Sequence, residues 1–159
     1  MSPKQPNLMT RLAEVPPLVT AFQSLMAAFG QTSFSPRERE VISTVVSVEN
    51  RCTYCVAFHT MLMSAANEDG TLVAALRGGG ALPDERLDAL AAFVRALVRG
   101  RGTVPADVAL RFAAAGFTDA QAREAIVGVA FQTLSNYANH VAPAALDEDL
   151  QPHRWSPGG

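Results

Sequence analysis

The chain has 159 residues, which is the size of one domain and leaves too little sequence for two of comfortable size. Its residues are 48% hydrophobic and 18% charged, a composition that fits a globular protein and excludes a disordered or fibrous one. The formal net charge is −2 and the basic residues are scattered, which argues against nucleic acid as a partner. No apolar run reaches membrane-spanning length and the N-terminus lacks the order of a signal peptide, so we expect no membrane partner and a cytoplasmic location.

Helices are predicted throughout, because alanine is abundant and no segment shows the alternation of a strand. Residues 1–15 have no sustained period and are expected to form a loosely held arm. The expected helices cover about 17–29, 36–49, 52–67, 71–77, 83–99, 105–116 and 118–140. The tail 147–159 contains two prolines and is expected to be irregular. We therefore predict an all-α, single-domain bundle of about six to seven helices that spans residues 16–146.

Two of the predicted helices begin with a capping box. In the first, Ser35 is the N-cap, Pro36 takes the first helical position and Glu38 follows three residues after the serine. In the second, Thr118 is paired with Gln121. The capping role accounts for Glu38 and leaves Glu40 as the acidic residue of interest on that helix.

Both cysteines lie in the motif Cys52–Thr53–Tyr54–Cys55, and His59 follows four residues later. Offsets of three and seven residues fall on one face of a helix, so these side chains are expected to form one site. Cys52 lies where the helix begins, and the free backbone N–H groups and helix dipole there favour a thiolate. In a reducing compartment, a Cys-x-x-Cys pair is more often redox-active or metal-binding than a structural disulfide.

Two other interpretations of the cysteines stay open. They could be two small buried residues that lie three apart by coincidence. They could also bind zinc together with His59, with Glu40 or His140 as the fourth ligand. Three ligands on one short helix would distort the tetrahedral geometry that zinc prefers, so we rank zinc below redox chemistry.

The predicted helix 36–49 has a second face made of small polar residues and one acid. Such a face suits a helix that packs on both sides and holds one carboxylate inside, although a solvent-facing Glu40 is the simpler alternative. Together, Glu40 and His59 could deprotonate a cysteine and later protonate a leaving oxygen. A thiolate, a second thiol and a proton source are what hydroperoxide reduction needs. The second face of the predicted helix 36–49 consists of Glu40, Ser43, Thr44 and Ser47.

The spacing from Glu40 through eleven residues to Cys52–Thr53–Tyr54–Cys55, and then through three residues to His59, carries a resemblance. It resembles the alkylhydroperoxidase D-like branch of the carboxymuconolactone decarboxylase superfamily, whose motif is Glu, eleven residues, then C-x-[HYSW]-C-x-x-x-H. The run Asn136–Tyr137–Ala138–Asn139–His140 is similar to a helix end in peroxidase-related members. The resemblance covers about residues 18–145.

The resemblance implies an all-helical fold, a Cys52/Cys55 dithiol–disulfide couple, and a proton relay from Glu40 through water and His59 to the thiols. It also implies assembly as trimers, hexamers or related homo-oligomers. The best-studied members have histidine between the cysteines, where this chain has Tyr54. The tyrosine could donate a hydrogen bond from its phenol or pack against a neighbouring helix.

The sequence thus predicts a cofactor-free, thiol-dependent hydroperoxide reductase that uses an external thiol as reductant. The alternatives are a lactone decarboxylase-type lyase of the same superfamily and a non-catalytic zinc or redox-sensing module. Asn136 and His140, four residues apart on the last helix, could face the pocket, although His140 could instead be a helix-terminal group that complements the helix dipole. Trp155 could anchor the tail on the chain's own surface or on a neighbouring subunit.

Overall fold

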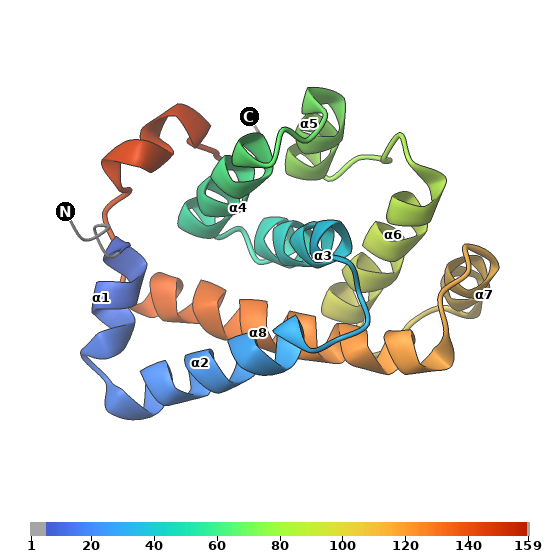
Figure 1. Cartoon of the computed structure of the whole chain (residues 1–159), viewed down its shortest axis with the longest axis horizontal. Helices are drawn as coiled ribbons and strands as arrows, with labels where there is room; N and C mark the ends of the chain where they lie inside the picture. The colour runs from blue at the N-terminus through green and yellow to red at the C-terminus, as the bar shows by residue number, and fades with distance from the viewer. Residues whose placement is uncertain (1–5, 159) are drawn as a thin grey trace.

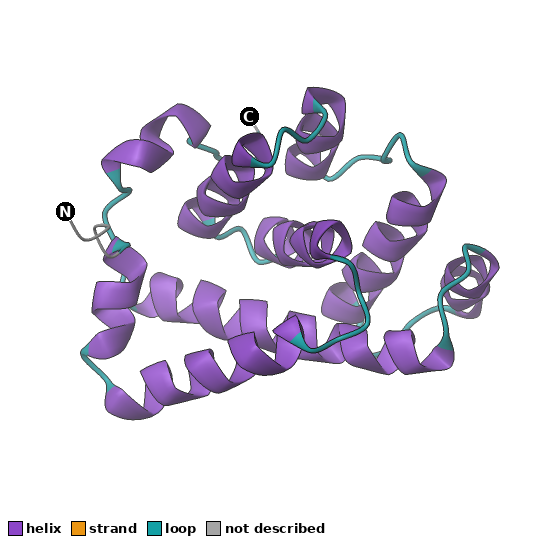
Figure 2. Cartoon of the chain, viewed as in Figure 1, coloured by secondary structure: helices purple, strands orange, loops and turns teal. Residues whose placement is uncertain are grey.

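A computed structural model describes residues 6–158, and helices joined by short loops form the regular structure in that range (Figures 1 and 2). These residues form no strand, and they make up one all-α domain, as predicted. No helix in this range has both the length and the apolarity needed to cross a membrane. In chain order the elements are α1 (Asn7–Ala13), α2 (Pro16–Gly30), α3 (Pro36–Glu49), α4 (Thr53–Ala65), α5 (Gly70–Gly78), α6 (Glu85–Arg99), α7 (Ala106–Ala114), α8 (Asp119–Val141) and the 3₁₀ helix η1 (Glu148–His153).

Helix α3 lies at the centre of the bundle, where α4, α5, α6 and α8 pack around it (Figure 1). Its apolar face is buried, and so is its opposite face of small polar residues. On that polar face, the hydroxyls of Thr44 and Ser47 donate to the carbonyl oxygens of Glu40 and Ser43, each at 2.8 Å. These bonds satisfy the buried hydroxyls within the helix itself. The prediction that both faces of this helix are packed is confirmed.

Helices α2 and α8 run side by side along one edge of the bundle (Figure 1). Their close approach depends on Gly128, where an added Cβ atom would lie 2.6 Å from Phe29 Cε2 and 2.8 Å from Ile42 Cγ2. One turn further along α8, the ring of Phe131 packs against Phe22 with 5.1 Å between the ring centroids. These contacts hold α8 in place, so that its C-terminal half packs against the start of α4.

Both predicted capping boxes are confirmed. Ser35 Oγ accepts from the backbone N–H of Glu38 at 3.2 Å, and the Glu38 carboxylate accepts from the backbone N–H of Ser35 at 2.8 Å. Glu38 also pairs with Arg86 at 2.9 Å, which makes it a structural residue as expected. Thr118 and Gln121 form the same reciprocal arrangement at the start of α8.

The two ends of the chain are more regular than predicted. Residues 7–13 form α1 with Leu8 and Leu12 buried, so the expected loose arm is wrong for its described part, and residues 1–5 lie outside the described range. The expected irregular tail is also wrong over residues 148–153, which form η1. Trp155 anchors this tail on the chain's own surface, since its indole N–H donates to the carbonyl oxygen of Arg77 at 3.0 Å. Helices of six or seven residues are too short to show a period in the sequence, and tertiary contacts rather than local propensity stabilise them.

Candidate active site

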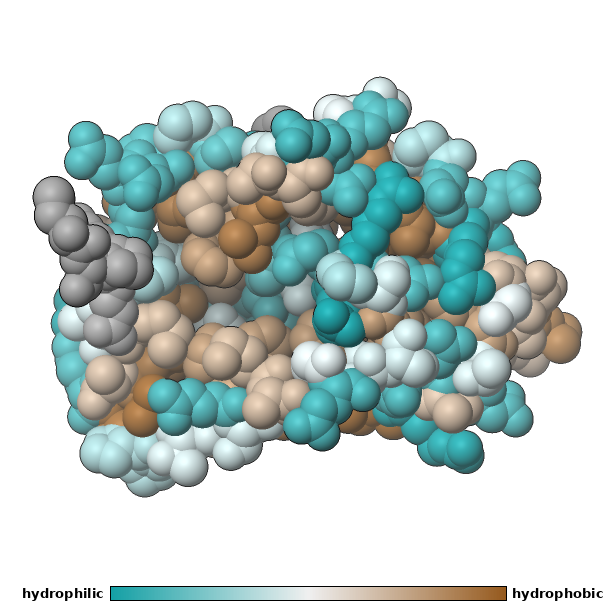
Figure 3. Space-filling view, viewed as in Figure 1, coloured by the Kyte–Doolittle hydropathy of each residue, from teal (hydrophilic) through white to brown (hydrophobic). Residues whose placement is uncertain are grey.

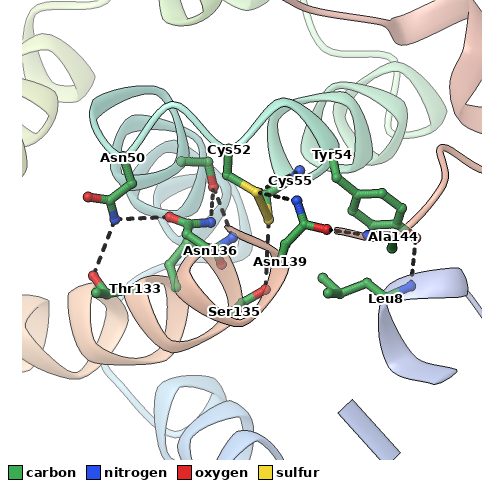
Figure 4. The surroundings of a disulfide bond; sticks show 12 residues. Leu8, Asn50, Cys52, Tyr54, Cys55, Thr133, Ser135, Asn136, Asn139 and Ala144 are labelled. Atoms are coloured by element: carbon green, nitrogen blue, oxygen red, sulfur yellow. Dashed lines mark hydrogen bonds between the residues drawn. A yellow bond between two sulfur atoms is a disulfide. The ribbon is translucent and has the colours of Figure 1, made fainter. Parts of the chain in front are cut away.

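The candidate site begins at the N-terminus of α4, where Cys52 and Cys55 form a disulfide (Figure 4). Their Cα atoms are 5.3 Å apart because three residues of chain complete the first turn of the helix between them. Cys52 is the N-cap, and its Sγ accepts from the backbone N–H of Cys55 at 3.3 Å. The expected pairing of the two cysteines at a helix start is present in the structure.

The two sulfur atoms have different surroundings. Cys52 is fully buried, and its Sγ accepts a hydrogen bond from Asn139 Nδ2 at 3.6 Å. Cys55 Sγ lies 3.8 Å from the hydroxyl of Ser135, and Cys55 lines a pocket that Cys52 does not line. A small molecule in this pocket would therefore meet Cys55 and not Cys52.

The pocket in front of Cys55 is walled by α1, α2, α4 and α8. Figure 3 shows a hollow with apolar residues around it between α2 and α4 on this face of the molecule. Its polar groups are few and lie close to the sulfur, and they include His59, Gln132 and Ser135. Such a lining suits a ligand with an apolar body and one reactive polar group. The apolar wall consists of Leu8, Met9, Phe22, Phe58 and Phe131.

His59 lies one turn after Cys55 on α4, and its Nδ1 is 2.9 Å from Glu40 Oε2 on α3. The His59 side chain is 8% exposed and that of Glu40 is 32% exposed, so the acid is half-buried rather than free in solvent. Because Glu40 engages Nδ1, Nε2 is the ring nitrogen left to exchange a proton with a group in the pocket. The prediction that Glu40 and His59 lie together is confirmed.

Glu40 also lines a second pocket that is separate from the one at Cys55. This second pocket is formed by the N-terminal part of α3, the C-terminal part of α4 and α5. The Glu40–His59 pair therefore connects two pockets, one at each end of the hydrogen bond. Such a pair can pass a proton between solvent on one side and a reacting group on the other.

Tyr54 directs its hydroxyl away from the disulfide (Figure 4). The hydroxyl donates to Asp147 Oδ2 at 2.5 Å and accepts from the backbone N–H of Leu8 at 3.4 Å. Burial, followed by the hydrogen bond to Asp147, raises the pKa of Tyr54 above its ordinary value. Asp147 also accepts from the backbone N–H of Asn7, the first residue of α1. Tyr54 thus ties α1 and the C-terminal segment to the start of α4, beside the pocket.

The prediction that Asn136 and His140 could face the pocket is wrong. Asn136 is fully buried and does not line the pocket; it accepts from Asn50 Nδ2 at 3.0 Å and donates to Ser47 Oγ at 3.3 Å (Figure 4). His140 is exposed in the last turn of α8, with its ring near that of Tyr137. Phe131, Gln132 and Ser135 occupy the pocket-facing side of α8, and the helical rotation of 100° per residue turns His140 away from that side. His140 fits the alternative of a helix-terminal histidine.

Sequence reasoning missed the residues of α8 that do reach the site, namely Gln132, Ser135 and Asn139. They follow one another at intervals of three and four residues, which places them on one face of the helix. A polar stripe at that spacing in an otherwise apolar helix is the signal that could have found them.

The described residues include no cluster of three or more His, Cys, Asp or Glu side chains placed to hold a metal ion. His140, proposed as a fourth zinc ligand, lies on the surface at the end of α8. Glu40, the other residue proposed as a fourth ligand, hydrogen-bonds to His59.

The chain matches the carboxymuconolactone decarboxylase family over residues 13–98, more than half of its length, and it belongs to that family. No match was found among curated proteins. Among solved structures, the fold is similar to an alkylhydroperoxidase AhpD core, an uncharacterized peroxidase-related protein from Ralstonia eutropha JMP134. The TM-score is 0.81 at 22% identity, over 94% of this chain and 80% of that one.

Two further structures share the fold. One is an uncharacterized peroxidase-related protein from Silicibacter sp. TM1040, with a TM-score of 0.78 and 22% identity over 91% of this chain and 78% of that one. The other is the debrominase Bmp8 in complex with 2,3,4-tribromopyrrole, with a TM-score of 0.76 and 16% identity over 94% of this chain and 81% of that one. At these identities the likeness establishes the fold.

Proposed function

We propose that this chain is a thiol-dependent hydroperoxide reductase in which Cys55 attacks the peroxide and Cys52 resolves the product. The observation that carries the proposal is the position of Cys55. It lines an apolar pocket together with His59, whose Nδ1 is held by Glu40, while Cys52 lies behind it within bonding reach. The family of the chain and its peroxidase-related structural neighbours support the same class of reaction.

The proposed reaction has two steps. In the first, the Cys55 thiolate attacks one peroxide oxygen, the O–O bond breaks, Cys55 becomes a sulfenic acid, and the departing alkoxide takes a proton from His59. In the second, the Cys52 thiolate attacks Cys55 Sγ, the S–O bond breaks, and the departing hydroxide is protonated to water. The proton that His59 gives to the alkoxide is the one that it takes from the Cys55 thiol, and the proton lost by the Cys52 thiol ends on the departing hydroxide. One hydroperoxide and two thiols thus become one alcohol, one water and one disulfide.

The pocket walls support an organic hydroperoxide as substrate. Aromatic and aliphatic side chains from four helices would bury the alkyl or aryl body, and the few polar groups lie near Cys55. An external thiol would return the disulfide to the dithiol by attacking Cys55, the cysteine that faces the pocket. A reducing compartment such as the cytoplasm would supply that thiol.

We also propose that the protein is a homo-oligomer, a trimer or a hexamer. Ile126, Tyr137 and Val141 are each more than half exposed and fall on one side of α8. An apolar stripe of this kind on a soluble surface is typical of a contact with another chain.

Stoichiometric oxidation tests the proposed activity. Fully reduced protein is mixed with one equivalent of cumene hydroperoxide, and the alcohol formed and the Cys52–Cys55 disulfide are measured together by chromatography and mass spectrometry. We expect one alcohol per disulfide, and no disulfide in Cys52→Ser or Cys55→Ser protein. Thiols that stay reduced in excess hydroperoxide would overturn the proposal.

The lyase alternative is separated from this one by a double variant. A lactone decarboxylase has no need of a dithiol, so Cys52→Ser/Cys55→Ser protein that still turned over a lactone substrate would favour the lyase. The presence of both cysteines at one helix start, paired and beside a Glu–His pair, supports redox chemistry instead.

A further inference from the structure

Asn139 lies beside the buried sulfur of Cys52 and has no place in the two-step reaction described above (Figure 4). Its Nδ2 donates to Cys52 Sγ at 3.6 Å, and the backbone N–H of Cys55 donates to the same sulfur at 3.3 Å. Two N–H groups from two different helices therefore converge on one sulfur atom that is fully buried.

The orientation of the Asn139 amide is fixed by a second hydrogen bond. Asn139 Oδ1 accepts from the backbone N–H of Ala144 at 3.0 Å, so the amide nitrogen must point to the sulfur (Figure 4). The Asn139 side chain is itself buried at 6% exposure, which limits its other rotamers. The donor is thus held in place before any charge forms on Cys52.

We propose that Asn139 is a positioning residue that stabilises Cys52 as a thiolate when the disulfide is open. A buried thiolate without donors would be costly, and N–H donors to a charged group are stronger than those between neutral groups. Neutral sulfur is a weak acceptor, whereas a thiolate is a strong one, so both N–H groups bind Cys52 more tightly once it is charged.

This assignment explains how the disulfide opens. When an external thiolate attacks Cys55 Sγ, the S–S bond breaks and its electron pair leaves on Cys52, while the attacking sulfur forms a mixed disulfide with Cys55. A leaving thiol with a low pKa departs faster, so Asn139 accelerates this step. In the forward reaction, the same contact keeps Cys52 in the nucleophilic form that attacks the sulfenic acid of Cys55.

The titratable side chains near Cys52 do not contact its sulfur, so the two N–H donors are the groups that can stabilise a negative charge there. On α4 these side chains are Tyr54, whose hydroxyl is bonded to Asp147, and His59, which is bonded to Glu40. Arg51 precedes the helix and is exposed, as is His140 at the end of α8. None of these side chains hydrogen-bonds to Cys52 Sγ within residues 6–158.

The inference rests on the proposed dithiol chemistry, but its test measures a thiol directly. In Cys55→Ser protein, Cys52 is the only thiol, and its ionisation is followed by thiolate absorbance and by the rate of alkylation across pH. Adding Asn139→Ala is expected to move the midpoint of this titration upward by about one to two pH units. The matched control adds Asn139→Ala to Cys52→Ser protein, in which Cys55 is the only thiol and the expected shift is under half of that.

Asn139→Asp is the second variant, for use if Asn139→Ala fails to fold. It keeps an acceptor for the N–H of Ala144 and replaces the donor with a carboxylate, so the Cys52 midpoint is expected to rise at least as far as with alanine. An unchanged Cys52 midpoint in the folded variant, or equal shifts of Cys52 and Cys55, would overturn the inference. If the Cys52 midpoint rises as expected but the unaltered protein does not reduce hydroperoxides, only the proposed function is overturned.

Discussion

The proposed reaction depends on the carboxylate of Glu40, which hydrogen-bonds to His59. Replacing Glu40 with Gln keeps a hydrogen-bonding group of the same shape against Nδ1 but removes the carboxylate. We expect the rate of peroxide-dependent disulfide formation to fall on the order of 100-fold, because the acid can no longer pass a proton to the imidazole. Stopped-flow measurement of hydroperoxide consumption under single-turnover conditions checks this.

Glu68→Gln is the matched control for this substitution. Glu68 lines the same second pocket as Glu40 but binds Arg37, at 2.8 Å, rather than the histidine. An ion pair near the surface contributes little, so both the rate and the stability should stay close to those of the unaltered protein. If the two variants slowed the reaction equally, the relay would lose its support.

Tyr54 gives a second prediction at the scale of single residues. Tyr54→Phe removes the hydroxyl that binds Asp147 and Leu8, and the free energy of unfolding should fall by about 1–3 kcal/mol. Tyr137→Phe keeps the ring and removes a hydroxyl that makes no hydrogen bond within residues 6–158, so it should leave the free energy of unfolding unchanged. Chemical denaturation of both variants at neutral pH checks the difference.

The same hydroxyl makes this contribution depend on pH. Because burial raises the pKa of Tyr54 in the folded protein, the folded state keeps a proton that the unfolded chain loses above its ordinary pKa of about 10. The contribution is therefore complete below pH 10 and declines as the pH rises further. Denaturation curves at pH 8 and pH 11 should show the gap between wild type and Tyr54→Phe narrowing, and a gap that widens would contradict the assignment.

Among the helices, the crossing of α8 with α2 and α3 is the contact that tolerates least change. Gly128→Ala would place a methyl group within 3 Å of Phe29 and Ile42, so the helices must separate, at a cost of about 1–3 kcal/mol. Gly30→Ala is the control, because an added Cβ there has no neighbour within 4 Å. Thermal unfolding should show a lower Tm for the first variant only, and equal Tm values would argue against this packing.

The helices that could be predicted from sequence are those with local signals. The segment 36–49 was placed correctly because a capping box starts it, and the last long helix begins at its own capping box. The end of α4 differs from the expected residue 67, since the helix stops at Ala65 and Asn67 takes a left-handed φ of 56°. Helix α1 was missed because it has only seven residues, and Tyr54 and Asp147, distant in sequence, hold it in place.

The same division between local and distant contacts applies to the site. The grouping of Cys52, Cys55 and His59 follows from spacing within one helix, and Glu40 lies on the helix before it. The contacts of Ser135 and Asn139 join residues 80 and 87 positions apart, and no pattern near the cysteines indicates them. The spacing of the motif predicted the reacting groups, whereas the packing of α8 shows which of its polar residues surround the sulfur atoms.

At the scale of the whole molecule, the exposed stripe on α8 predicts assembly. Size-exclusion chromatography with light scattering should give the mass of a trimer or a hexamer, and Tyr137→Glu should reduce it by placing a charge in the contact. Leu110→Glu is the control, because Leu110 is 71% exposed on α7, outside the stripe. A monomeric wild type, or the same loss of mass in both variants, would contradict the prediction.

In the proposed reaction Cys55, and not Cys52, attacks the hydroperoxide. Reduced Cys52→Ser and Cys55→Ser proteins are each treated with cumene hydroperoxide in the presence of dimedone, which traps sulfenic acids, and the adduct is located by mass spectrometry. The position of Cys55 in the pocket predicts rapid labelling of Cys55 in the first protein and none of Cys52 in the second. Labelling of Cys52 at the faster rate would contradict the account.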